Sequence, residues 1–170
     1  LYNFTGDAGW VSGHKASCEK ALDYMLKRDS NGNHLVEMMT NSQTERRGSD
    51  WIDIIWASYE NAFVNAKLYL ALTFWADVER QLGDAVKADY YAGYAAELKK
   101  SFNKSIADGG FWNPANRWYI HWLDKEGSPH GDNLVVPVNF MAIVYGICDD
   151  TTRCKAILDK IEEQTNKENL

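Results

Sequence analysis

The fold of this chain is decided by the stretch WASYENAFVNAKLYLALTFWADVERQLGDAV, residues 56–86. From Trp56 to Leu82, apolar side chains would lie on nearly every face of a helix, which is typical of a helix enclosed by others. Glycine is favoured just past a helix end and aspartate just before a helix start, so Gly83 and Asp84 indicate a minimal connection. We predict an antiparallel helical hairpin over 56–82 and 85–106.

Amphipathic patterns predict two further helices at the ends of the chain. Residues 11–28 place Cys18, Leu22 and Met25 on one face, and residues 152–164 repeat the pattern around Ile157. The first of these helices stops at the turn-forming run 29–33, and residues 34–39 are predicted to be extended.

The segment between the hairpin and the last helix has two predicted parts. Residues 111–130 are rich in Trp and Tyr, and 118–122 alternate like a strand, which favours a small β-hairpin or an ordered loop. Residues 134–147 are almost wholly apolar and predict a buried helix capped by Asp132 or Asn133, with Pro137 in its first turn. Helices that are apolar on all sides thus alternate along the chain with amphipathic helices. This alternation predicts an all-α fold in two concentric layers, with residues 1–170 forming a single domain.

Composition narrows the possible partners. The chain has 170 residues and a net charge of −6, so it lacks the basic surface that nucleic-acid binding requires. No apolar run is long enough to predict a membrane span. Three cysteines match no zinc pattern, no phosphate-binding loop is present, and we expect no metal and no cofactor. Two of the cysteines are able to form one bridge, and the pattern does not select them.

Aromatic residues make up 13% of the chain, with seven Trp and nine Tyr. These side chains have a flat apolar face and a polar edge, which suits the faces of sugar rings as well as a protein core. Within GSDWIDIIWASYENAF, residues 48–63, two carboxylates and two indoles occur just before the predicted hairpin. A carboxyl group beside apolar rings and a second carboxylate is favoured in its protonated form, as a general acid must be.

The order of several motifs resembles the six-hairpin glycosidases, the (α/α) toroid enzymes that include trehalase and the processing α-glucosidases. The motifs are Asp29-Ser30-Asn31-Gly32 followed by Leu35-Val36-Glu37, Asp50-Trp51-Ile52-Asp53, Tyr59-Glu60-Asn61-Ala62, Gly83-Asp84, and the 133–147 segment ending in Tyr145-Gly146-Ile147. The resemblance implies helical hairpins of a toroid, a carbohydrate substrate, and cleavage of an O-glycosidic bond with inversion. It also implies a general acid in the Trp-x-Asp pattern, which Asp53 matches, with Asp50 as the second candidate.

Further residues are candidate sugar contacts, each with an alternative structural role. Trp51 and Trp56 are predicted sugar platforms or core residues, and Asp50 and Asp53 are alternatively helix caps. In the alternative interpretation, Glu60 pairs with a neighbouring side chain and Asn61 forms hydrogen bonds with backbone groups. The complete set of predicted substrate contacts is Trp51, Trp56, Tyr59, Glu60, Asn61, Trp10, Trp118 and His130.

One acidic pattern is better interpreted as a turn than as a metal site. Asp29, Asn31, Asn33 and Glu37 have part of the spacing of a calcium loop, but Gly32 is at its fourth position, where the helix-loop-helix pattern needs glycine at the sixth. We therefore predict a turn without metal.

An inverting hydrolase needs a second carboxylate roughly 6.5 to 9.5 Å from the acid to activate water. In the six-hairpin glycosidases this base comes later in the sequence. In this chain, no segment after Ile147 has the pattern expected of a cleft-lining element. We expect the chain to be part of a larger catalytic domain, whose remainder is a partner. Two other functions stay open: a glycoside phosphorylase, and a non-catalytic helical module that binds glycan or protein through its Trp-rich edge.

Overall fold

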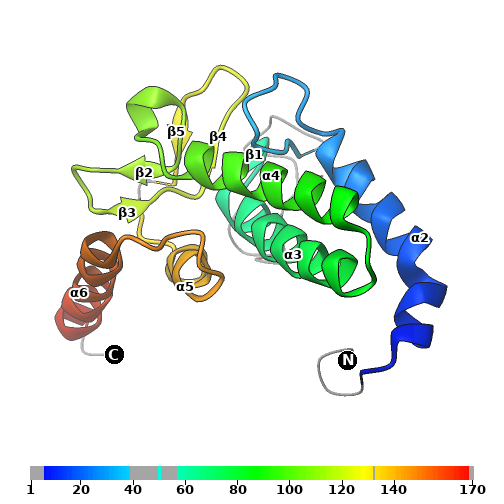
Figure 1. The fold of residues 1–170 in the computed structure, drawn as a ribbon. Helices are drawn as coiled ribbons and strands as arrows, with labels where there is room; N and C mark the ends of the chain where they lie inside the picture. Colours follow the sequence, from blue (N-terminus) through cyan, green and yellow to red (C-terminus); the bar gives the residue numbers. More distant parts are fainter. Residues whose placement is uncertain (1–5, 39–49, 51–56, 132, 169–170) are drawn as a thin grey trace.

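The structure is a computed structural model that describes residues 6–38, 50, 57–131 and 133–168 (Figure 1). A helical hairpin of α3 (Ala62–Gln81) and α4 (Ala85–Phe102) lies at its centre, which confirms the predicted antiparallel pair. Gly83 has φ of +85°, and the carboxylate of Asp84 accepts a hydrogen bond from the Lys87 backbone N–H at 3.1 Å. Buried apolar side chains of both helices form the core of the hairpin: Leu68, Leu72, Ala76, Tyr91, Ala95, Leu98 and Phe102.

The first helix of the hairpin differs from the prediction in two ways. It begins at Ala62 rather than at Trp56, because Glu60 and Asn61 form the short strand β1 (Glu60–Asn61). The side chain of Asn61 then caps α3 by accepting a hydrogen bond from the Val64 backbone N–H at 3.0 Å. The predicted full enclosure is also wrong, because Phe74 on α3 is 55% exposed.

Helix α2 (Ala8–Leu26) confirms the amphipathic helix predicted at the start of the chain. It packs beside the hairpin (Figure 1), and ion pairs tie it there. Lys15 Nζ lies 2.6 Å from Glu79 of α3, whose side chain is fully buried, and 3.0 Å from Asp84. Lys87 of α4 donates to Glu19 at 2.5 Å. A buried carboxylate is costly without a cation, so Lys15 fixes α2 against the hairpin.

The Trp-rich segment forms two small antiparallel sheets, as the prediction of a small β-hairpin near 111–130 indicated. Strands β2 (Trp112–Asn113) and β3 (Trp118–Tyr119) pair with each other, and η1 (Ile106–Asp108) precedes them. Strand β4 (Trp122–Leu123) pairs with both β1 and β5 (Pro129–His130). The predicted alternation over 118–122 is wrong, because the chain passes from one sheet to the other and residues 119–123 are all buried.

Helices α5 (Val136–Val144) and α6 (Thr151–Glu168) lie on the other side of the hairpin from α2 (Figure 1). Helix α5 is shorter than the predicted 134–147, because Pro137 stands in its first turn and Gly146, with φ of +73°, follows its end. Its N-cap residue is Val135 and makes no side-chain capping bond, so the predicted cap at Asn133 is wrong; Asp132 lies outside the described residues. None of the helices in the described ranges has the length and apolar character to cross a membrane.

Candidate functional site

The N-terminal end of α3 is where segments far apart in the sequence meet. Asn61 of β1 lies opposite Trp122 of β4, and Trp122 lies opposite His130 of β5. Glu37 forms an isolated bridge with Glu60 on the remaining edge of β1. This small sheet therefore gathers polar side chains at the end of the hairpin where α3 begins.

Asp50 is held at this end by two buried donors. His121 Nε2 donates to Asp50 Oδ2 at 2.8 Å, and Asn61 Nδ2 donates to the same oxygen at 3.0 Å. The side chains of His121 and Asp50 are 0% and 1% exposed. These two contacts tie residue 50 to β1 and to the residue that precedes β4.

The imidazole of His121 is tightly confined. Its Nδ1 is buried without a hydrogen-bond partner among the residues that the structure describes. Gly131 follows β5 with φ of +82°, and a Cβ at this position would lie 2.7 Å from the Cβ of His121. Glycine is required here for both reasons, because a side chain would be strained and would displace the histidine.

A second buried carboxylate, Glu60, is held by neutral groups. Glu60 Oε1 accepts hydrogen bonds from the side-chain amides of Asn31 at 2.9 Å and Asn33 at 2.7 Å. The Asn33 backbone N–H donates to Asn31 Oδ1 at 3.0 Å, so the run 29–33 forms a turn, as predicted, that presents both amides to Glu60.

Glu37 lies next to Glu60 and is also held by neutral donors. Its carboxylate accepts bonds from the Ser30 hydroxyl at 2.7 and 2.8 Å and from the Ser30 backbone N–H at 3.1 Å. Glu37 and Glu60 are only 8% and 4% exposed, and the described part of the chain places no Lys or Arg in an ion pair with either of them.

Electrostatics at Glu60 favour its protonated form. Burial raises the pKa of Glu60, the hydrogen bonds from Asn31 and Asn33 lower it, and the charges of Glu37 and Asp29 raise it further, with a net increase. The pKa of the neighbouring Tyr59 hydroxyl is also raised. Burial is the larger cause, and the charge of Glu37 is the second. Tyr59 has φ of +24°, an uncommon backbone conformation for a tyrosine that is typical of functional sites.

An aromatic stack forms between β4 and β5. The rings of Trp122 and His130 are 4.2 Å apart and inclined by 17°. His130 Nε2 is 2.8 Å from Asp124 Oδ2, and although burial raises the pKa of Asp124, its hydrogen bonds with His130 and the Ser128 N–H lower it overall. The stack thus presents a ring of fixed orientation beside β1.

A groove of about 570 Å³ lies between α2 and α3, and Asp50 is the only acidic residue in its described lining. The remaining lining is apolar except for Lys67. Phe63 and Phe74 contribute aromatic rings to it. The anchored carboxylate of Asp50 therefore borders the concavity beside α3.

The structure brings together five of the ten predicted site residues: Asp50, Tyr59, Glu60, Asn61 and His130. Asp53, Trp51 and Trp56 lie outside the described residues. Trp10 is in the first turn of α2, with its ring stacked on His14, and α2 separates it from the α3 end by more than 20 Å at about 1.5 Å per residue. Trp118 packs in the core beside α5 and α6, so neither Trp10 nor Trp118 joins the other predicted contacts.

Sequence reasoning missed the contributions of His121, Glu37 and Trp122 to this site. Only Glu37 had a local signal, since it follows the asparagine-rich turn that reaches Glu60. In the described ranges, no group of three or more His, Cys, Asp or Glu side chains is arranged to hold a metal ion. Comparison with protein-family models and with curated proteins gives no match to the chain.

Proposed function

We propose that this chain carries the general acid of a glycoside hydrolase, with Asp53 as the proton donor. The proposal rests on the resemblance of its motifs to the six-hairpin glycosidases and on one structural observation. The described residues on either side of Asp53 in the sequence both lie near the N-terminal end of α3. Asp50 is hydrogen-bonded by His121 and Asn61, and Ala57 is 2% exposed.

Asp50 supports the proposal because it is three residues before Asp53 in the sequence and borders the groove beside α3. A general acid needs a carboxyl group that stays protonated near neutral pH, and burial and neighbouring carboxylates favour that form. The apolar and aromatic lining offers faces on which sugar rings stack.

The surrounding residues take supporting roles in this proposal. Asp50 is held by His121 and Asn61, and the buried carboxylate of Glu60 is occupied by Asn31 and Asn33. Of the predicted sugar contacts that the structure brings together, Tyr59 and His130 are partly exposed, whereas Glu60 and Asn61 are buried, so Tyr59 and His130 are the candidate contacts for sugar hydroxyl groups. In the toroid that the resemblance implies, α3 and α4 are one of the hairpins around the cleft.

The test is Asp53→Asn in the complete protein, assayed on aryl glycosides with poor and good leaving groups. Removing a general acid lowers the rate by roughly 10²–10⁴-fold. We expect this loss with phenyl or natural glycosides, and a much smaller loss with 2,4-dinitrophenyl glycosides, whose leaving group departs without a proton. The matched control is Asp77→Asn on the exposed side of α3, which should leave both rates unchanged.

Several outcomes would contradict the proposal. Equal losses with both leaving groups would show that Asp53 does not donate the proton, and unchanged activity would move the role to another residue. Turnover that depends on inorganic phosphate would identify a glycoside phosphorylase instead. Quenching of Trp fluorescence by oligosaccharides, without turnover of any of them, would identify a binding module.

A further inference from the structure

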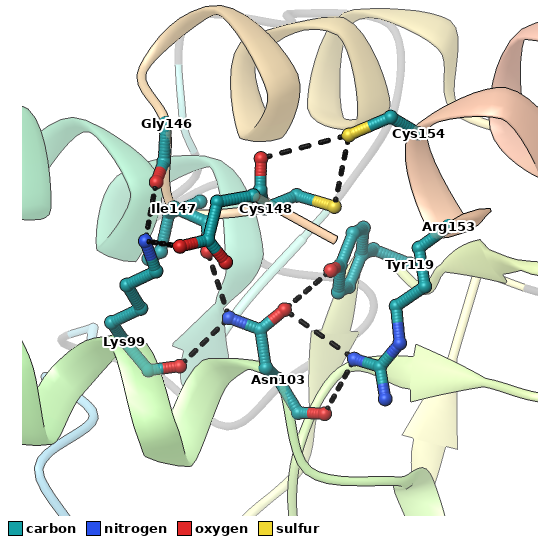
Figure 2. Close-up of polar contacts among 9 residues, drawn as sticks. Lys99, Asn103, Tyr119, Gly146, Ile147, Cys148, Arg153 and Cys154 are labelled. Carbon is teal, nitrogen blue, oxygen red and sulfur yellow. Dashed lines mark hydrogen bonds and ion pairs between the residues drawn. The ribbon is translucent and has the colours of Figure 1, made fainter. Parts of the chain in front are cut away.

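Two of the three cysteines face each other at the start of α6. The Sγ atoms of Cys148 and Cys154 are 3.5 Å apart, and the Cys154 thiol also points at the carbonyl oxygen of Cys148 at 3.7 Å (Figure 2). Cys148 lies in the connection between α5 and α6, and Cys154 lies in the first turns of α6. Both thiols are reduced, whereas Cys18 belongs to α2 on the other side of the hairpin.

A hydrogen-bond network fixes the segments that carry these thiols (Figure 2). Asn103, at the end of α4, donates to the Ile147 carbonyl at 2.8 Å and accepts from the Tyr119 hydroxyl at 2.5 Å. Lys99 donates to the Gly146 carbonyl at 2.9 Å, which holds the same connection from the other side. The residues that precede Cys148 are therefore held in place on α4.

Arg153 holds the start of α6 in the same way. Its guanidinium donates to the Asn103 carbonyl at 2.8 Å and lies over the ring of Trp112 at 4.7 Å from the centroid. The carboxylate of Asp150 caps the helix by accepting from the Thr152 and Arg153 backbone N–H groups at 2.8 and 3.1 Å. Both sulfur atoms are thus presented to each other by well-anchored backbone.

We propose that Cys148 and Cys154 form a reversible disulfide that clamps the start of α6 to the end of α5. A disulfide bond measures about 2.05 Å, so closure requires the sulfur atoms to approach by only about 1.5 Å. The bridge would close a short ring around the α5–α6 connection. Of the α6 side chains that the structure describes, only Ile157 is buried, so this clamp would add a covalent link to a helix with little buried surface of its own.

The oxidant we name is a small-molecule disulfide such as oxidised glutathione. Cys154 is half-buried, so its thiolate reacts first: its sulfur bonds to one glutathione sulfur, the glutathione S–S bond breaks, and one glutathione leaves as a thiolate. Cys148 then loses its proton to solvent and attacks Cys154 Sγ, which releases the second glutathione. Overall, two protein thiols are oxidised to one disulfide and one oxidised glutathione is reduced to two thiols.

The burial of Cys148 supports this order of attack. Burial raises the pKa of the Cys148 thiol to about 11, although its hydrogen bond with Tyr119 opposes the increase. A thiol with such a pKa is almost entirely protonated near pH 7 and is a poor first nucleophile. Held next to Cys154, however, it is placed to resolve a mixed disulfide.

The experiment uses Cys18→Ala protein, so that only the proposed pair remains, incubated with oxidised glutathione and analysed by peptide mapping and intact mass. We expect loss of both thiols, no retained glutathione and a peptide pair linked through Cys148 and Cys154. The melting temperature should rise by roughly 4–8 °C, and dithiothreitol should reverse the rise. Protease cleavage within α6 should slow in parallel.

Two matched variants separate the proposal from its alternatives. In the same background, Cys148→Ser should stop at one glutathione on Cys154, and Cys154→Ser should remain largely unmodified. A retained glutathione on the parent protein, a bridge between two molecules, or failure of both thiols to oxidise would overturn the proposal. These results are independent of glycosidase activity.

Discussion

Replacing Asp50 by alanine tests whether this carboxylate anchors the candidate site. The substitution removes the acceptor of two donors, His121 Nε2 at 2.8 Å and Asn61 Nδ2 at 3.0 Å, in a place where the carboxylate side chain is only 1% exposed. Leaving a buried donor without its acceptor costs about 1–3 kcal/mol. In a chain of this size that loss lowers the melting temperature by roughly 2–12 °C.

The measurement is urea unfolding followed by Trp fluorescence and circular dichroism, with Asp89→Ala as the control because the Asp89 side chain is 80% exposed. Asp50→Asn keeps one acceptor oxygen and should lose about 1–2 kcal/mol. A double-mutant cycle with His121→Ala should show a coupling of at least about 1 kcal/mol. A loss for Asp50→Ala below about 0.5 kcal/mol, as for a surface residue, would refute the anchoring role.

Two further predictions concern the neighbours of this pair. Gly131→Ala should lower the free energy of unfolding more than Gly127→Ala, because both glycines have φ near +80° but only a Cβ at 131 would meet His121, at 2.7 Å; equal urea midpoints would contradict this. Glu60→Gln should flatten the pH dependence of stability. Since the folded-state pKa of Glu60 is raised, its stabilising contribution is full below the ordinary value of 4.5 and is lost as pH rises through the folded pKa. Urea midpoints of wild type and Glu60→Gln should therefore diverge above pH 4.5 in favour of the variant, and parallel curves would count against the shift.

The parts of the fold predicted from the sequence are those set by local signals. Gly83 and Asp84 act on their immediate neighbours, so the turn between α3 and α4 was predictable from two residues. The start of α3 was not, because Glu60 and Asn61 are drawn into a strand by β4, which comes much later in the chain. Pairing with a distant strand overrides the helical preference that the neighbouring apolar residues suggest.

The candidate site shows the same division between local and distant information. Tyr59, Glu60 and Asn61 were predicted as a group from one motif, and they lie together in the structure. The Asp50–His121 pair joins residues 71 positions apart, and no local pattern distinguishes His121 from a buried core residue. Trp10 and Trp118 were predicted from side-chain type alone, and residue type does not specify which end of a helix or sheet a ring occupies.

Buried carboxylates at the two ends of the α3–α4 hairpin have different kinds of partner. At the α3 C-terminal end, Glu79 is fully buried and Lys15 Nζ lies 2.6 Å from it, so the charge is neutralised and the contact serves stability. At the α3 N-terminal end, Glu37 and Glu60 are buried against hydroxyl and amide donors, and no described Lys or Arg forms an ion pair with them. Neutral donors do not offset the charge of a neighbouring carboxylate, and the pKa of Glu60 is raised accordingly. Carboxyl groups with a perturbed proton affinity cluster at functional sites, so this end of the hairpin is the better candidate of the two for a working site.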